Sequence, residues 1–154
     1  MSISFREGDA ATNRGGVDIT ISLTAEEAEA IGGELGPLAD AMAGALWALA
    51  VLRTDTVPAD QDDGPGARPD RPATADTWVT AIHDVEQRLL PRLEGIRDAA
   101  MRAHAASGGS YGELARALGV TARSTAQYRR DTLQARMPSE WEIWALTGKR
   151  PTQD

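Results

Sequence analysis

Hydrogen-bonding side chains gather between residues 110 and 130, and they are the groups in this sequence best suited to recognition chemistry. The guanidinium of Arg123 can pair with O6 and N7 of guanine, and the amide of Gln127 can bridge N6 and N7 of adenine. Four residues separate the two, so they share one face of a helix. Small neighbouring side chains allow close approach to a thymine methyl or a phosphate. The candidates for base recognition are Thr121, Ala122, Arg123, Ser124 and Gln127.

Positive charge surrounds these candidates although the whole chain is acidic. The formal net charge of −7 disfavours a polyanionic partner. Between positions 97 and 136, however, seven arginines are offset by only three acidic residues. Arginine and serine side chains that flank a recognition helix contact the phosphate backbone, which adds affinity without sequence choice. The candidates for phosphate contacts are Ser110, Arg116, Arg129 and Arg130.

Two short helices joined by a tight turn are predicted to position these groups. Ser110 and Glu113 have the spacing of a capping box, which starts the first helix. Gly119 ends it, because glycine tolerates the positive φ that a tight turn needs. Thr121 is predicted to cap the second helix.

This segment resembles the helix-turn-helix of bacterial transcriptional regulators over residues 111–130. The resemblance rests on the small Ala115 where two helices approach, on Gly119 in the turn, and on apolar side chains at the usual core positions, Leu114, Leu118, Val120 and Tyr128. Thr125 is expected to face inward at a position that usually carries a branched apolar residue, which is a departure from the motif. The resemblance implies a three-helix DNA-binding domain whose last helix enters the major groove.

The residues available for catalysis or metal binding are few. The chain has no cysteine, so disulfides, thiolate metal sites and cysteine nucleophiles are excluded. Its two histidines, His83 and His104, are far apart in sequence and lack carboxylates at a ligand spacing. No phosphate-binding loop, dinucleotide fingerprint or nucleophile elbow is present. The sequence therefore predicts a protein that is not an enzyme and that holds neither a metal nor a cofactor.

The N-terminal part predicts a strand followed by two helices. Residues 17–23 alternate apolar with polar side chains, as in a strand with one buried face. No convincing second strand follows, so the same segment of another copy is the expected partner. A helix capped by Thr24 comes next, and a second helix is expected from Pro37 to Arg53. The twelve residues before Arg53 are apolar or glycine, a run too short to cross a bilayer but one that self-association would bury.

A third helical segment is expected to begin near Thr77. Pro91 lies inside its apolar stripe, so the segment is either one kinked helix or two helices that meet near Leu90. A last short helix capped by Ser139 is expected to pack its two tryptophans against the domain or a second subunit. The floor beneath the two-helix motif is expected to consist of Ile96, Ala100 and Ala103.

The sequence thus predicts a mainly α protein in three parts. Residues 1–54 form a strand-helix-helix unit that joins two copies into a homodimer. Residues 55–76, rich in proline, glycine and aspartate, form a flexible acidic linker, and residues 77–154 form the helix-turn-helix domain with a short C-terminal helix. The resemblance implies a sequence-specific transcriptional regulator of bacterial type, a repressor, that binds double-stranded DNA. The N-terminus has neither a basic leader nor an apolar segment, so a cytoplasmic location without membrane association is expected.

Two other interpretations fit parts of the pattern. The first is a protein-interaction adaptor that binds another protein through the helix-turn-helix surface; steep salt dependence of duplex binding separates it from a DNA-binding protein. The second comes from the N-terminal order of strand, helix and helix, which is that of ribbon-helix-helix DNA binders. There, Asp18 lies on the polar face that would meet the bases, in strongly acidic surroundings. The strand is therefore interpreted as a pairing device.

Overall fold

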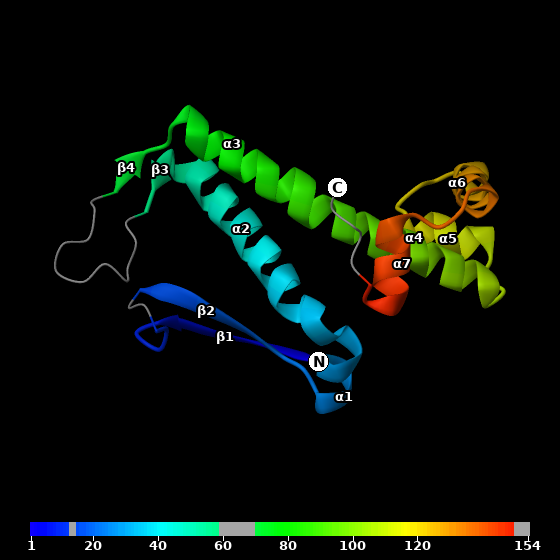
Figure 1. Ribbon diagram of the computed structural model, residues 1–154, viewed down its shortest axis with the longest axis horizontal. Helices are drawn as coiled ribbons and strands as arrows, with labels where there is room; N and C mark the ends of the chain where they lie inside the picture. Colours follow the sequence, from blue (N-terminus) through cyan, green and yellow to red (C-terminus); the bar gives the residue numbers. More distant parts are fainter. Residues whose placement is uncertain (13–14, 59–69, 150–154) are drawn as a thin grey trace. The chain divides into compact units, whose positions relative to one another are not determined.

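The computed structural model describes residues 1–12, 15–58 and 70–149 of the 154-residue chain. Helices dominate these residues and are accompanied by two small two-stranded sheets (Figure 1), which confirms the predicted mainly α class. The chain divides into two compact units, Met1–Gly36 and Pro37–Asp154. This division differs from the sequence-based one, which kept residues 1–54 together.

The N-terminal unit contains a β-hairpin in which β1 (Ser2–Gly8) pairs antiparallel with β2 (Gly16–Ser22). The strand predicted at residues 17–23 is confirmed. The expectation that its partner comes from another copy is wrong, because β1 supplies the partner within the chain. The alternation of Ile3 and Phe5 with polar residues was the signal that could have identified β1.

The two faces of this hairpin differ in chemistry. Arg6 lies opposite Asp18 on the polar face, and the Asp18 carboxylate also accepts hydrogen bonds from the amide and the hydroxyl of Thr12, both at 2.9 Å. These bonds lower the pKa of Asp18. The apolar face remains exposed and consists of Ile3, Phe5, Val17, Ile19 and Ile21.

A nearly continuous helical segment follows the hairpin. It comprises α1 (Ala25–Ile31), a 3-10 turn η1 (Gly32–Glu34) and α2 (Leu35–Thr54). The predicted cap is confirmed, because the Thr24 hydroxyl accepts from the Glu27 amide while the Glu27 carboxylate accepts from the Thr24 amide. This segment is longer than the apolar run that the sequence suggested. By length and composition alone it could cross a membrane, a property shared by core helices of soluble proteins.

Short strands and a long helical path form the next part of the chain. β3 (Thr56–Val57) and β4 (Arg71–Pro72) pair within the segment predicted to be a linker, of which residues 59–69 lie outside the described residues. α3 (Ala75–His83), a π-helical turn η2 (Asp84–Leu89) and α4 (Leu90–Ala106) then run as one path (Figure 1).

The π turn lies directly before Pro91, which occupies the first turn of α4. Proline has no N–H to donate and its ring crowds the carbonyl four residues earlier. The Leu90 amide donates to the Val85 carbonyl, five residues back, so the backbone widens at this point. The segment is therefore one helical path with a local π turn, close to the first of the two predicted alternatives.

Three further helices complete the second unit: α5 (Tyr111–Ala117), α6 (Arg123–Ala135) and α7 (Glu140–Thr147). A buried cluster holds α5 and α6 on α4, made of Met101, Leu114, Ala115, Ala126 and Leu133, with Leu118 and Val120 packed against it. α7 packs on α4 from another side.

The residues that α4 buries are not those that the sequence suggested. The expected floor of Ile96, Ala100 and Ala103 is wrong, since all three are exposed. α4 instead buries Gly95, Ala99 and Met101. Only Met101 belongs to the cluster beneath α5 and α6, and a Cβ on Gly95 would touch Trp141 of α7. α4 therefore packs against α7 as well as against α5 and α6. A single stripe of apolar residues does not account for both contact surfaces.

α7 docks through two tryptophans, as predicted. Ser139 caps it, Trp144 is buried, and the rings of Trp141 and Trp144 meet edge to face with centroids 5.5 Å apart. The Arg92 guanidinium lies 4.9 Å from the centre of the Trp141 ring, a cation–π distance.

An ionic cluster that the sequence did not reveal lies where α7 meets α4 and the end of α6. Glu142 is 0% exposed. Its carboxylate accepts from Arg102 Nε at 2.6 Å and from the Ser139 amide at 3.0 Å, and Arg136 lies 2.5 Å away. Arg102 also donates to the carbonyl of Leu133. One buried carboxylate thus joins three helices.

This cluster makes the stability of the second unit depend on pH. Burial alone would raise the pKa of Glu142, but the Ser139 amide and the two arginines outweigh it and lower the pKa from 4.5 to about 2. A lowered pKa stabilises the fold fully above pH 4.5, and this contribution is lost as the pH falls toward about 2. We expect the free energy of unfolding to fall by at most about 3 kcal/mol from this source. Denaturant titrations across this range test the expectation, and Glu142→Gln should flatten the pH dependence.

Candidate nucleic-acid interface

The predicted capping box at the start of α5 is present. The Ser110 hydroxyl accepts from the Glu113 amide at 3.2 Å, and the Glu113 carboxylate accepts from the Ser110 amide at 2.8 Å. The amide bond and a second bond from the Ser110 hydroxyl lower the pKa of Glu113. The Ser110 side chain is therefore already engaged, although it remains exposed.

The turn after α5 forms as the glycine indicated. Gly119 has φ +64°, and its amide donates to the Arg116 carbonyl at 3.2 Å. The amide of Val120 reaches back to the Ala115 carbonyl at 3.0 Å. This pair of bonds is a Schellman motif, in which the residue after the glycine packs against the helix that has just ended. Val120 does so, since it lies against the buried cluster.

The predicted start of α6 is wrong by one position. Its first helical residue is Arg123 and its cap residue is Ala122, which makes no side-chain capping bond. Thr121 therefore lies in the turn and does not cap the helix. Residues 121 and 122 are exposed in extended or turn backbone ahead of the helix.

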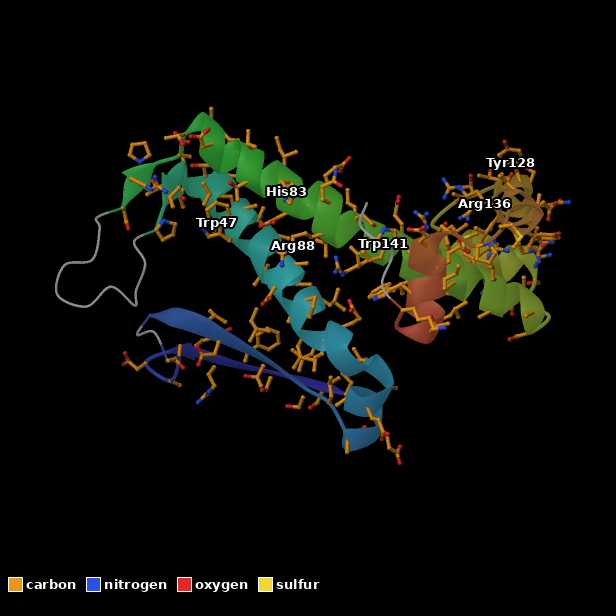
Figure 2. All side chains as sticks on the ribbon, in the orientation of Figure 1. Trp47, His83, Arg88, Tyr128, Arg136 and Trp141 are labelled. Atoms are coloured by element: carbon orange, nitrogen blue, oxygen red, sulfur yellow. The ribbon has the colours of Figure 1, made fainter. Side chains whose placement is uncertain are left out.

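The buried face of α6 also differs from the predicted one. Ala126 and Leu133 are buried, with Arg130 partly buried between them. Thr125 and Tyr128 were expected to face inward, and both are exposed. Two residues correspond to a rotation of about 200°, so burying Ala126 places Tyr128 on the opposite side. The side chain of Tyr128 projects from α6 and is 72% exposed (Figure 2).

Three interactions of polar side chains connect α5 and α6 at the edge where the two helices meet. The Arg130 guanidinium lies 3.6 Å from the centre of the Tyr111 ring, and its Nη1 donates to the Gly109 carbonyl at 2.8 Å. The Tyr111 hydroxyl donates to Asp131 at 3.1 Å. Arg130, predicted to contact phosphate, thus already holds the two helices in register.

The five candidates for base recognition are all exposed along the turn and the first two turns of α6: Thr121, Ala122, Arg123, Ser124 and Gln127. Arg123 lies beside Gly112 of α5, where a Cβ would come within 3.3 Å of its Nε. The absence of a side chain at Gly112 leaves room for the guanidinium at the surface. Within the described residues, the side chains of Arg123 and Gln127 make no hydrogen bond or ion pair.

Among the phosphate candidates, Arg116 and Arg129 are also exposed. In the part of the chain that the structure describes, neither side chain forms a hydrogen bond or an ion pair. The side chains of Arg102, Arg130 and Arg136 differ, because they already bind the Glu142 carboxylate or backbone carbonyls. Arg116 and Arg129 therefore present guanidinium groups that remain available for a ligand.

Shallow depressions lie on both flanks of α6. On the side of α5, a cavity of about 370 Å³ is lined in part by Arg116, Thr121 and Arg123. On the side of α4, a second cavity of about 370 Å³ is lined in part by Tyr128, Arg129, Thr132 and the arginines 97 and 136. Of this second set the sequence prediction included only Arg129 as a site residue, because the set comes together only when α6 packs against α4.

The two histidines remain apart. His83 is mostly exposed on α3, whereas Nε2 of His104 lies 3.8 Å from the Glu113 carboxylate at the start of α5. Among the described residues no group of three or more histidine, aspartate or glutamate side chains is placed to hold a metal ion.

Comparison with known proteins gives no match, whether to a protein-family model, a curated protein or a solved structure.

Proposed function

We propose that this chain is a sequence-specific DNA-binding transcriptional regulator, a repressor, in which α4, α5 and α6 form a helix-turn-helix domain and α6 enters the major groove. One observation carries the proposal. The start of α6 presents Arg123, Ser124 and Gln127 to solvent, and no other described group hydrogen-bonds the side chain of the arginine or of the glutamine. Guanidinium and amide groups held in this way match the donors and acceptors on the edges of guanine and adenine.

The surrounding charges suit the backbone of a duplex. Arg116 and Arg129 flank the exposed face of α6 and have no acidic partner within hydrogen-bonding distance among the described residues. Arginines in such positions add affinity without sequence choice. We assign phosphate contacts first to these two, and only secondarily to Ser110 and Arg130, which already have bonds within the fold. A cytoplasmic location and a homodimer joined through residues 1–54 belong to the same proposal.

Duplex binding tests this assignment. Duplexes are selected from a random-sequence library, and binding is then followed by fluorescence anisotropy at several salt concentrations. We expect Arg129→Ala to weaken binding to all sequences alike and to reduce the slope of log K against log salt by about one. The exposed Arg53 on α2 provides the matched control, and Arg53→Ala should leave both quantities unchanged. An unchanged slope in Arg129→Ala would remove this residue from the interface.

Sequence preference is tested separately at Arg123. We expect Arg123→Ala to cost about 1–3 kcal/mol at a single guanine position and to relax the preference there. The same selection repeated with the variant measures this change. If the selected sequences are identical for both proteins, Arg123 does not read a base.

A second candidate function is a protein-interaction adaptor that uses the same surface. The observation that favours it is Tyr128, an aromatic side chain that is 72% exposed at the middle of the outer face of α6. Exposed tyrosines are enriched at the centres of protein interfaces. Failure of the wild-type chain to retain any duplex at low salt would favour the adaptor.

A further inference from the structure

We infer that α2 pairs with α2 of a second copy along a seam of apolar side chains. The inference supplies the interface for the homodimer of the proposed function. The pairing itself does not require DNA, so the two can be tested independently.

The seam follows the repeat of a coiled coil. Leu35, Met42, Leu46 and Leu49 are separated by seven, four and three residues, and Ala39 fills the intermediate position. Alternating spacings of three and four place these residues on one line along the helix. The four large side chains are 41–57% exposed.

The opposite side of α2 is already covered. Its buried residues are Ala41, Ala48 and Val51, which lie about half a turn away from the seam. Ala48 and Leu52 line an apolar depression together with Trp78 and Ala81 of α3. The helix is therefore two-sided, with one side packed within its own unit and the other side apolar and not covered by that unit.

The surroundings of α2 argue for a protein partner and against a bilayer. A Cβ on Gly44, in the middle of α2, would lie 3.3 Å from the carboxylate of Asp84. Asp84 in turn pairs with Arg88 at 3.3 Å. Charged groups beside the middle of a helix are costly in hydrocarbon. A second copy instead offers the same apolar seam, and a repeat of 3.5 residues fits a helix better than a strand, whose repeat is two.

The expected dimer is weak. A helix of 20 residues is about 30 Å long and 10 Å wide, so its footprint is on the order of 300 Å². A standard interface buries about 800 Å² per partner. Dissociation constants in the micromolar range are therefore expected, and binding of two motifs to adjacent half-sites on DNA would strengthen the association by raising the effective concentration.

Sedimentation equilibrium of the full chain tests the pairing. We expect wild-type protein to show a monomer–dimer equilibrium below about 100 µM, and Leu46→Glu to raise the dissociation constant at least about tenfold. Met137→Glu is the control, because Met137 is also strongly exposed but lies between α6 and α7. A wild-type chain that stays monomeric, or a Leu46→Glu variant that dimerises as well as wild type, would overturn the inference.

Disulfide trapping gives a second measurement that does not place a charge in the seam. Because the chain has no cysteine, single variants Met42→Cys, Leu46→Cys and Leu49→Cys can be oxidised and compared with Met137→Cys. We expect covalent dimers from the seam positions and not from Met137→Cys. Equal trapping at all four positions would contradict a specific seam.

Two alternatives to pairing through the α2 seam, a membrane contact and self-association through the hairpin, predict different results. Recovery of wild-type protein, but not Leu46→Glu, with phosphatidylcholine–phosphatidylglycerol vesicles would assign the face to a membrane. Loss of the dimer in Phe5→Glu together with its persistence in Leu46→Glu would assign self-association to the apolar face of the hairpin. Either result overturns the inference. Dimerisation without duplex binding would leave it intact and contradict only the proposed function.

Discussion

Replacing Glu142 with alanine is expected to lower the free energy of unfolding of the second unit by about 3–5 kcal/mol. The carboxylate is fully buried and neutralises Arg102 and Arg136, which approach it from α4 and from the end of α6. Removing the carboxylate leaves Arg102, whose side chain is only 21% exposed, without its acidic partner. Arg136 keeps its ion pair with Asp98. Chemical denaturation followed by tryptophan fluorescence measures the loss, since Trp144 is buried on the same helix.

The matched control is Glu140→Ala, which removes an exposed carboxylate from the first turn of the same helix. We expect this change to cost less than about 1 kcal/mol, through the helix dipole alone. Similar losses for the two variants would show that burial of Glu142 adds nothing to its contribution.

Substitution of Gly95 with alanine is expected to destabilise the protein by about 1–3 kcal/mol. A Cβ at this position would lie 2.5 Å from the backbone carbonyl oxygen of Trp141, so α4 and α7 must separate to admit it. In an unobstructed helix, the same change is expected to stabilise by roughly 0.5–1 kcal/mol. The sign of the effect therefore reports the close contact between the two helices.

Gly33 offers the comparison, because it lies in the 3-10 turn η1 and a Cβ there would meet no atom within 4 Å. Gly33→Ala should leave the midpoint of thermal unfolding unchanged or raise it slightly. If Gly95→Ala behaves like Gly33→Ala, α7 does not pack on α4 as closely as described.

The Glu142 cluster and the Gly95 contact both bear on the proposed interface, because both involve α4, against which α6 packs. Arg102 donates to the carbonyl of Leu133 near the end of α6, and Arg136 follows directly after that helix. Arg123 and Arg129 lie on its exposed surface and make no such bonds within the described residues. Variants at Glu142 and Gly95 should therefore lower both stability and DNA binding. Variants at Arg123 and Arg129 should lower DNA binding alone.

Local sequence signals predicted most of the helix ends. Ser110 with Glu113, Thr24 with Glu27, and Ser139 each cap a helix as expected, and Gly119 adopts the positive φ that its turn requires. These features depend on residues three or four positions apart, so the chain contains the information locally.

The sequence predicted less well which side chains point toward the core and which toward solvent. Thr125 and Tyr128 were assigned inward, and Ile96, Ala100 and Ala103 were assigned to the floor, yet all five are exposed. Apolar periodicity identifies a stripe but does not say which partner will cover it. Here α7 covers Gly95, and the small Ala126 marks where α6 meets the other helices.

The sequence by itself determined where most helices begin and where the chain turns after α5, and which exposed candidates carry groups able to recognise a base. Only the tertiary structure decided that β1 pairs with β2, that Arg130 stacks on Tyr111, and that Glu142 joins three helices. The physical reason is the range of the interactions. Caps and turns are satisfied by neighbours along the chain, whereas a buried charge or a packed face is satisfied by residues some 20 to 40 positions away.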